Sequence, residues 1–445
     1  MPAPTTDAEV LIVGAGPVGL FTALRLGQAG ISVAVLERDD HLSQLPRACM
    51  FYPQVQFALD QAEVYNDLIE EGGGFRTTGL DIRLPPASNS NGGKEPGQLV
   101  ANFPREDAAE FNPKGPPRAP MDGTPAISML NIPQSQMCQV LMNKAVGTGH
   151  VRVLFSKELV SIESDGSGEG NPNVSIRVQD LVSNTESQYT ASFLIGADGG
   201  RSKTRSLLGI PFPGHTWPEK LVATDVWLPN EDGGPATTTL LMDSVHYTVL
   251  SPLTPPILGE VSKWRVTFAL NPEELKTKDD EDFLTEGYIA QHYDRVWVGP
   301  RPLSYKIDRK AIYTVHQRLA ANLKKGRCLL AGDAAHVNNV IGGLGLSNCL
   351  LDSVALSDAL VMILREGKPA DPVLTMYSDE RRQVFQFFVD PVSSWSKLRI
   401  QSGEADDWFF RSLNDTSSPS FARYIDTLEN FWPTHIRDTA KLLAT

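Results

Sequence analysis

The chain has 445 residues, of which 41% are hydrophobic and 21% charged, as expected of a soluble globular protein with two or three structural units. The formal net charge of −13 excludes a broad basic surface for nucleic acid. The four cysteines form no CxxC pair and no zinc-like spacing with histidines, so reduced thiols and no metal site are expected. No secretory signal and no membrane span is expected, which together with the cysteines favours a cytoplasmic protein.

The first pattern, at 9–40, is strand, glycine turn, helix and second strand. The β-branched run Val10–Val13 stops at a glycine, Leu20–Leu26 has the apolar spacing of a helix, and 31–37 resumes as a buried strand. These segments form one right-handed βαβ unit, and Gly30 is placed to end its helix. The chain therefore opens on an α/β domain with a parallel sheet.

A glycine motif lies inside this unit, where Gly14-x-Gly16-x-x-Gly19 follows the first strand and opens the helix. Gly14 permits the turn, Gly16 lets backbone amides approach a pyrophosphate, and Gly19 allows the helix to pack closely on the strand. Glu37 ends the second strand and is placed to accept hydrogen bonds from a ribose, and Arg38 follows it as a further candidate. The motif indicates a dinucleotide at the helix N-terminus without distinguishing NAD from FAD.

Changes of composition divide the rest of the chain. Residues 76–133 are rich in Pro, Gly and Asn and are expected to form long surface excursions with a few short strands. Alternating hydrophobicity between 211 and 302 predicts a separate, mostly antiparallel sheet. Helices are expected at 134–145, at 348–364 and over roughly the last eighty residues, and strands at 151–164, 175–199 and 327–331.

Two later motifs narrow the choice of cofactor. They are FLIGADGGRSKTRSLLGI at 193–210 and GRCLLAGDAAH at 326–336. With the first glycine motif, they resemble in order and spacing the three fingerprints of the class A FAD-dependent aromatic hydroxylases, the para-hydroxybenzoate hydroxylase-like group. The resemblance covers most of the chain from Val10 to about Pro372.

The resemblance implies an α/β fold in which a Rossmann-like FAD-binding domain is interleaved with a mostly antiparallel substrate-binding sheet, followed by a helical C-terminal region. On this chain, the FAD-binding domain is expected at 1–75, 130–210 and 303–370, the substrate sheet at 76–129 and 211–302, and the helical region at 371–445.

The resemblance also implies the activity. It indicates a monooxygenase that takes electrons from NADPH or NADH and hydroxylates a phenolic or polyketide-like aromatic substrate with O2, through a C4a-hydroperoxyflavin. No second Rossmann domain for NADPH is expected, because the family has none. A role in secondary metabolism and a homodimer, which is usual among relatives, are further expectations.

Several residues are carried over as cofactor contacts. Asp333 would accept hydrogen bonds from ribityl hydroxyls, and the glycines 342, 343 and 345 would let the chain run flat under the isoalloxazine. A helix starting near Ser347 would aim its N-terminus at the pyrimidine ring. The other cofactor contacts that the resemblance implies are Arg47, Gln134, Asp198, Gly332, Gly343, Gly345, Leu346 and Ser347.

Two positions depart from the family pattern, which usually has proline where this chain has Val340 and asparagine where it has Ser347. Without the rigid proline, the reacting carbon could lie differently against the flavin. Epoxidation, oxidative decarboxylation and dehydrogenation of a related substrate therefore stay open. A protein that holds FAD without turnover is a further alternative, and it would not be reduced by NADPH at a useful rate.

The substrate residues are harder to read. His246 and Tyr247 are expected on a strand with one face toward the flavin, and they are the candidates for deprotonating a phenol. Ser251 falls where benzoate hydroxylases begin a carboxylate clamp, but no arginine follows it closely, which favours a neutral or larger phenolic. Late aromatic residues, among them Phe409 and Phe410, are candidates for a lid over the substrate.

Overall fold

The central sheet of the molecule has six strands and contains the expected βαβ unit. The computed structural model describes residues 7–44, 49–103, 111–116, 128–168 and 172–441. All neighbours in this sheet are parallel except β20, which pairs antiparallel with β21. In spatial order the strands are β10 (Val151–Leu154), β2 (Val33–Leu36), β1 (Val10–Val13), β14 (Phe193–Gly196), β21 (Cys328–Leu330) and β20 (Lys324–Lys325).

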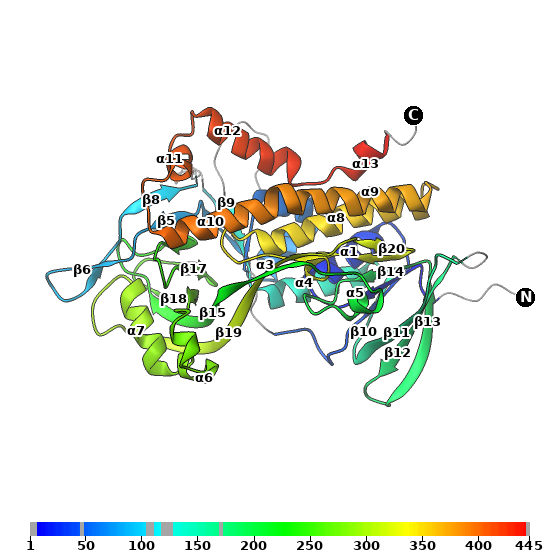
Figure 1. Cartoon of the computed structure of the whole chain (residues 1–445), viewed down its shortest axis with the longest axis horizontal. Helices are drawn as coiled ribbons and strands as arrows, with labels where there is room; N and C mark the ends of the chain where they lie inside the picture. The colour runs from blue at the N-terminus through cyan, green and yellow to red at the C-terminus, as the bar shows by residue number, and fades with distance from the viewer. Residues whose placement is uncertain (1–6, 45–48, 104–110, 117–127, 169–171, 442–445) are drawn as a thin grey trace, which may run out of the picture.

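Both faces of this sheet are covered, so its parallel strands are uniformly apolar and buried. The helix α1 (Pro17–Gln28) packs against α4 (Gln134–Gly147) and α8 (Leu344–Leu364) in a layer on one side. A meander of three antiparallel strands packs against β1 and β2. Its strands are β11 (Lys157–Asp165), β12 (Val174–Asp180) and β13 (Thr185–Ala191) (Figure 1). The helix, the strands and the meander expected over 134–199 are confirmed.

The second sheet has eight strands and is antiparallel except where β16 runs parallel to β5. It confirms the separate, mostly antiparallel sheet. Its order is β22 (His336–Val337), β19 (Lys306–Leu319), β15 (Gly214–Pro229), β18 (Val261–Ala269), β17 (Thr248–Pro252), β16 (Thr239–Leu241), β5 (Asp81–Arg83) and β8 (Leu99–Asn102).

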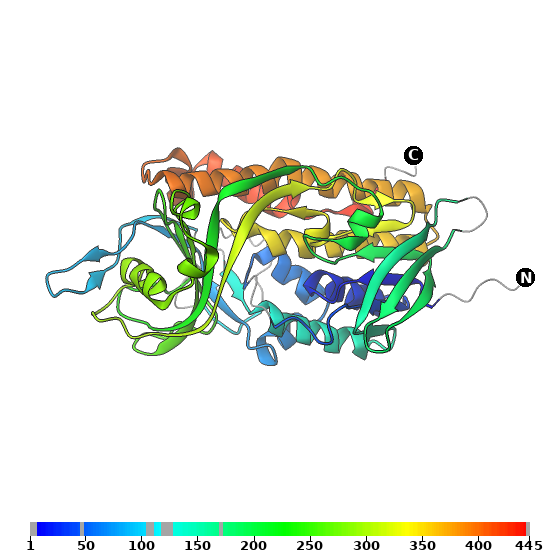
Figure 2. The same cartoon turned by 60° about the horizontal axis from the view of Figure 1, so that its bottom comes forward.

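The longest strands of this sheet, β15 and β19, form a ribbon that runs from the far end of the second sheet toward the central sheet (Figure 2). β19 pairs with β15 from Lys306 to Arg318, so the second sheet extends well past residue 302, where the sequence placed its end. The boundary was misplaced because the alternation in β19 is weak: most of its residues are half-buried or exposed.

The two faces of the second sheet differ. One face packs on α6 (Asp280–Phe283) and α7 (Glu286–Val296) and forms a core of its own around Trp264 and Trp297. The other face, with Leu221, Leu240 and Ala269, joins the main core around the central sheet. Strand alternation therefore directs every second residue of the second sheet toward that main core.

Short elements connect the two sheets. A three-stranded sheet consists of β3 (Met50–Phe51), β9 (Ser128–Asn131) and β4 (Phe75–Thr78), and a hairpin of β6 (Ala87–Ser88) and β7 (Lys94–Glu95) projects at the end of the molecule that holds the second sheet. The short helices are α2 (Pro53–Gln61), α3 (Tyr65–Glu70) and α5 (Lys203–Leu207).

The C-terminal region is helical, as expected, and lies along one side of the molecule (Figure 1). A π-helical turn, Phe385–Val389, joins its two longest helices. The region contains α9 (Ala370–Val384), α10 (Asp390–Ser402), α11 (Trp408–Asn414), α12 (Pro419–Asp426) and α13 (Ile436–Thr439). Among the described residues, only α8 is long and apolar enough to cross a membrane, and 72% of that stretch is buried inside the molecule. Its apolar character is explained by the core that it fills.

Candidate functional site

The carboxyl ends of four neighbouring parallel strands, β2, β1, β14 and β21, meet at one edge of the central sheet. Glu37 follows β2, Gly14 follows β1, Asp198 lies two residues after β14, and Gly332 lies two residues after β21. Residues far apart in the sequence therefore share the edge at which α/β sheets bind ligands.

The three glycines of the first turn differ in what surrounds them. A Cβ on Gly14, whose φ is +105°, would lie 2.5 Å from the Ala197 carbonyl oxygen, and a Cβ on Gly19 would lie 2.1 Å from the Gly14 carbonyl oxygen. A Cβ on Gly16 would meet no atom within 4 Å. The chain itself thus requires glycine at positions 14 and 19, whereas the space beside Gly16 is open for a ligand.

Glu37 lies directly against this turn. One oxygen of its carboxylate accepts from the Ala15 amide at 2.7 Å and the other accepts from the Asp39 amide at 3.0 Å. The side chain is half-buried, so it can still accept from a ribose hydroxyl. Arg38 is exposed and donates only to the exposed Asp39, at 3.4 Å, among the described residues.

Asp198 serves the local structure as well as the site. Its carboxylate accepts from the Ser202 hydroxyl and from the amide and hydroxyl of Thr204, the last two at 2.9 and 3.0 Å. These bonds fix the turn into α5. Arg205, on α5, is buried, and it donates to the Ala334 and Gly200 carbonyls at 2.8 and 2.9 Å.

The turn after β21 brings the third motif to the same edge. A Cβ on Gly332, whose φ is +65°, would lie 2.8 Å from a methyl of Val18 at the start of α1, so this turn touches the first glycine turn. Asp333 is exposed, and one of its oxygens lies 3.6 Å from the Cys349 sulfur. The exposed carboxylate is placed to accept hydrogen bonds from ligand hydroxyls.

The segment that contains Gly342, Gly343 and Gly345, here called the glycine strip, leads into the N-terminus of α8. The helix begins at Leu344, three residues before the start expected near Ser347, because Gly343 caps it in the left-handed conformation with φ +65°. Gly345 and Leu346 therefore lie in the first turn, where backbone amides lack an intrahelical partner. The Ser347 hydroxyl is buried and has no hydrogen-bond partner in the described part of the chain.

Two further candidates fall elsewhere. Gln134 is the first residue of α4 and is half-buried, with Pro133 capping the helix before it. Arg47 lies outside the described residues.

The placement expected for His246 and Tyr247 is wrong, because both precede β17 rather than lying on a strand. An Asx turn from Asp243, which accepts from the amides of Val245 and His246, ends the preceding extended segment. The His246 ring contacts the Ala269 carbonyl oxygen at 2.9 Å.

Tyr247 is buried and donates to Glu219 at 2.7 Å, and Glu219 also pairs with Lys397 at 2.5 Å. Burial and the Glu219 charge raise the pKa of the Tyr247 phenol. Neither His246 nor Tyr247 lines the pocket described next, which disfavours the acid–base role predicted for them.

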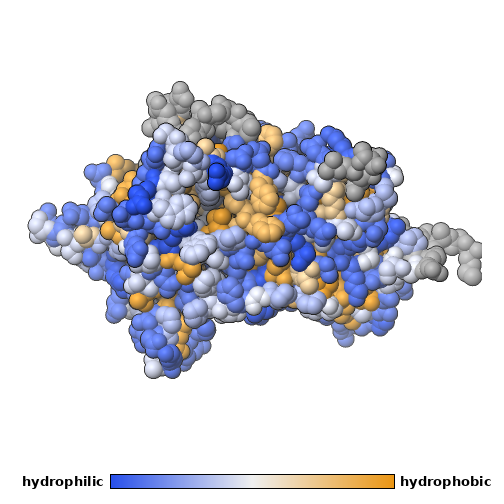
Figure 3. Space-filling view, turned by 45° about the horizontal axis from the view of Figure 1, so that its top comes forward, coloured by the Kyte–Doolittle hydropathy of each residue, from blue (hydrophilic) through white to orange (hydrophobic). Residues whose placement is uncertain are grey.

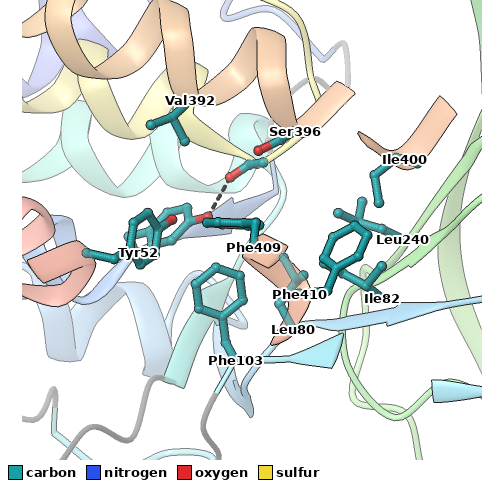
Figure 4. Close-up of a pocket in the computed structure, with 12 residues that line it drawn as sticks. Tyr52, Leu80, Ile82, Phe103, Leu240, Val392, Ser396, Ile400, Phe409 and Phe410 are labelled. Carbon is teal, nitrogen blue, oxygen red and sulfur yellow. Dashed lines mark hydrogen bonds between the residues drawn. The ribbon is translucent and has the colours of Figure 1, made fainter. Parts of the chain in front are cut away.

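An apolar pocket lies between the second sheet and the C-terminal helices (Figure 4). The empty volume within the pocket and the open solvent at its mouth together amount to about 430 Å³. Gly342, next to α8, forms part of the wall, so the pocket borders the glycine strip. The wall consists of Tyr52, Leu80, Ile82, Phe103, Leu240, Gly342, Val392, Ser396, Ile400, Phe409, Phe410 and Tyr424.

Aromatic side chains from four separate segments line this pocket. Phe409 contacts Tyr424 edge-on at 5.7 Å, and Phe103 lies 6.1 Å from Tyr424. Tyr52 donates its hydroxyl to the Gly342 carbonyl at 2.5 Å, which fixes the glycine strip at the wall of the pocket. Sequence reasoning identified Phe409 and Phe410 as lid candidates but missed Tyr52 and Tyr424, since single tyrosines carry no motif.

The arginine that the sequence did not find beside Ser251 comes from the next strand. Ser251 on β17 pairs in register with Arg265 on β18. The Arg265 guanidinium donates to Asp225 at 2.8 and 2.7 Å, and both side chains are buried. Because Asp225 neutralises this charge, the pair does not form a carboxylate clamp of the benzoate type.

The residues at the sheet edge fit FAD. The open space at Gly16, the half-buried Glu37 carboxylate and the exposed Asp333 suit a pyrophosphate, a ribose and a polyhydroxy chain in turn. The free amides at the start of α8 suit the electron-rich end of a flavin.

Comparisons with known proteins agree with this reading. A family model described as "FAD binding domain" matches residues 7–391. The chain is 30% identical to para-nitrophenol 4-monooxygenase of Pseudomonas sp. (strain WBC-3), over 86% of this chain and 85% of that protein. It is 29% identical to 6-hydroxy-3-succinoylpyridine 3-monooxygenase of Pseudomonas putida, over 95% and 98% of the two chains.

Solved structures show the same fold. A p-nitrophenol 4-monooxygenase from Pseudomonas putida DLL-E4 superposes with a TM-score of 0.71, at 26% identity, over 99% of this chain and 97% of that one. An aklavinone-11 hydroxylase in complex with FAD and aklavinone gives a TM-score of 0.69 at 24% identity, over 88% and 68% of the two chains.

Proposed function

The chain belongs to the FAD-binding-domain family matched over residues 7–391 and is an FAD-dependent monooxygenase, and on this basis we propose that its apolar pocket takes a neutral phenolic or larger aromatic substrate for hydroxylation. When bound, FAD supplies the redox and oxygen-transfer chemistry, with NADPH or NADH as the reductant. The protein binds and orients both molecules and keeps water from the reacting ring.

The observation that carries the substrate class is the absence of charge from the pocket wall. None of the described lining residues carries a charged side chain. Burying an unpaired carboxylate there would cost several kcal/mol, on the order of the penalty for any uncompensated buried charge. The Arg265–Asp225 pair is already neutral and offers no counter-charge. These features support a substrate without a carboxylate at its buried end.

Two hydroxyls provide the polar contacts that such a substrate would use. Ser396 on α10 and Tyr424 on α12 both line the pocket, and neither hydroxyl has a hydrogen-bond partner among the described residues. Each can donate to or accept from a neutral oxygen substituent. The name of the relative para-nitrophenol 4-monooxygenase describes a substrate of this kind, a small phenol with a neutral polar group.

Anaerobic reduction of the bound flavin by NADPH tests this function. The rate is measured alone, with 4-nitrophenol, and with methyl 4-hydroxybenzoate against 4-hydroxybenzoate, a pair that differs in charge at one end. The neutral ester is expected to accelerate reduction at least tenfold more than the acid. Equal acceleration by the acid would contradict the neutral pocket.

The same experiment separates the alternatives left open by Val340, which is 38% exposed next to the glycine strip. If no phenol accelerates reduction by NADPH, while a reduced aromatic substrate bleaches the flavin directly, the enzyme is a dehydrogenase. Product analysis under O2 separates hydroxylation from epoxidation and from oxidative decarboxylation.

We also propose that the enzyme is a cytoplasmic homodimer with an FAD-binding unit, a substrate sheet and a C-terminal helical region. Exposed aromatic residues on the C-terminal helices support the dimer: Phe387, Trp395 and Trp408 are 72%, 58% and 57% exposed. Figure 3 shows apolar side chains gathered among polar ones on this side of the molecule. Light scattering at several protein concentrations tests the dimer, and a strictly monomeric mass would contradict it.

A further inference from the structure

A chain of buried polar side chains connects the C-terminal segment to the turn that carries Asp333. It starts at Trp432, which is fully buried and follows the π-helical turn Thr427–Phe431. The indole N–H donates to the Asn348 side-chain oxygen at 3.0 Å, and the Trp432 carbonyl accepts from Arg381 at 2.9 Å. Trp432 therefore holds both α8 and α9 by hydrogen bonds.

Arg381 continues the chain toward the cofactor turn. It donates to the Asn348 side-chain oxygen at 2.6 Å and to Asp352 at 2.7 Å, and all three residues are fully buried. The guanidinium balances the Asp352 carboxylate, as a buried charge requires. Its planar donors join two residues of α8 at a fixed spacing.

Asp352 makes the final contact with the cofactor turn. Its second oxygen accepts from the Gly332 amide at 2.9 Å and contacts His336 at 2.7 Å. Gly332 and His336 flank Asp333, so Asp352 fixes the turn on both sides of the exposed carboxylate. Four consecutive contacts thus link Trp432 to the backbone of the turn.

The same tryptophan also supports the second glycine turn. The Trp432 ring packs edge-on against Tyr52, with centroids 5.2 Å apart, and Tyr52 donates to the Gly342 carbonyl. One residue, beyond the last position matched by the family model, therefore contacts the supports of both turns. The fit of these turns to FAD makes this arrangement relevant to the cofactor.

We propose that Trp432 and Arg381 are positioning residues that hold the Gly332–Asp333 and Gly342–Gly343 turns in the geometry that binds FAD tightly. This inference rests on the proposed function only in that the enzyme binds FAD. Trp432 touches Tyr52 and Asn348 rather than the open space of the site, so it acts through them. Removing it leaves the exposed groups in place but loosens their backbone.

The test compares FAD dissociation constants of full-length variants, from flavin fluorescence on adding FAD to apoprotein, with the urea stability of each apoprotein. Trp432→Leu is expected to raise the dissociation constant at least tenfold and to blur the fine structure of the visible flavin band. Trp297→Leu is the matched control, because Trp297 is as buried but lies in the separate core beneath the second sheet. It is expected to lower stability while changing the dissociation constant less than twofold.

Two milder variants keep the test decisive if Trp432→Leu does not fold. Trp432→Phe keeps an aromatic ring against Tyr52 but loses the indole N–H and the volume of the second ring, so an intermediate dissociation constant is expected. Arg381→Lys keeps the charge beside Asp352 but cannot reach all its acceptors, so a several-fold increase is expected. Wild-type affinity in these variants, or an equal effect of Trp297→Leu, would overturn the proposal. Failure of the wild-type protein to bind FAD would instead overturn the proposed function.

Discussion

At the scale of single residues, the turn after β1 places chemically identical residues in different surroundings. Gly14 and Gly19 pack against backbone atoms, and Gly16 borders empty space. Gly14 and Gly19 are therefore required by the folded chain, whereas Gly16 is required by the ligand. The same substitution should therefore damage stability at one position and cofactor binding at another.

Gly16→Ala is expected to leave the free energy of unfolding of the apoprotein within about 0.5 kcal/mol of wild type, because φ there is −75° and the methyl meets no atom. It should still weaken FAD binding at least tenfold, since the methyl fills the approach to the turn. Urea denaturation and a fluorescence titration with FAD measure the two quantities.

Gly19→Ala is the control, and it is expected to destabilise the apoprotein by about 1–3 kcal/mol through the clash with the Gly14 carbonyl. The interpretation fails if Gly16→Ala destabilises the apoprotein as much as Gly19→Ala does.

Residue types with fixed backbone roles could be predicted from the sequence, whereas side chains that act through tertiary contacts could not. The glycine turns, Glu37 and Asp333 were found because their spacing reflects local geometry. Tyr52 and Trp432 were missed because their partners, Gly342 and Asn348, are 290 and 84 positions away. Such contacts depend on the whole fold and leave no local pattern.

At the scale of helices and strands, the same difference between local pattern and tertiary contact explains two boundaries that the sequence placed wrongly. Helix α8 begins at Leu344 because Gly343 takes the left-handed conformation, although Gly345 inside the first turn lowers helix propensity. The second sheet continues past residue 302 through β19 to Arg318 because β15 pairs with this strand, although its alternation is weak. Tertiary pairing decided both boundaries against the local signal.

The contact of α10 with β15 contains a buried ion pair whose two partners are 3% and 2% exposed, Lys397 and Glu219. Lys397→Met is expected to destabilise the protein by about 3–5 kcal/mol, because it leaves the Glu219 charge buried and unpaired. Adding Glu219→Gln should restore most of that loss, and chemical denaturation of the single and double variants measures it. Equal stability of Lys397→Met and of the double variant would show that the Glu219 charge is solvated.

Asp352, on α8, makes part of the folding stability of the protein depend on pH. Burial alone would raise the pKa of its carboxyl, but His336 and Arg381 together lower it from 3.8 to about 2. A carboxyl with a lowered pKa stabilises the fold above its unfolded value and loses that contribution as pH falls toward the folded value. The contribution is therefore complete above about pH 4 and is lost between pH 4 and 2.

Comparison with Asp352→Asn isolates this effect from other carboxyls. The variant should be less stable than wild type at pH 6, and the difference in free energy of unfolding should shrink below pH 4. Urea titrations at pH 6, 4 and 3 measure it. A difference that stays constant over this range would mean that Asp352 does not titrate with the fold.

At the scale of the whole molecule, the β15–β19 ribbon joins the two sheets into one structure. At its cofactor end, β19 pairs with β22, in which His336 follows the Asp333 turn. At its other end, Trp227 of β15 pairs with Lys306 in the second sheet. Loss of the second sheet would therefore remove a support of the turn that carries Asp333.

Unfolding is accordingly expected to be one cooperative transition, with release of the flavin at the same midpoint as loss of secondary structure. Excess FAD should raise this midpoint, because it binds only the folded chain; at 100 times the dissociation constant the gain is about 2.7 kcal/mol. Flavin fluorescence and circular dichroism during one thermal ramp check this. Release of flavin well below the unfolding midpoint would show that the two sheets unfold separately.

The chain of contacts that links Gly332 to Trp432 also sets the order of events during synthesis of the enzyme. During translation, Gly332 leaves the ribosome 100 residues before Trp432 does. At ordinary elongation rates this interval lasts roughly 5–20 s. Throughout it, the nascent chain has its glycine turns but not the tryptophan that holds them. The newly made protein should therefore bind its flavin tightly only after Trp432 has left the ribosome.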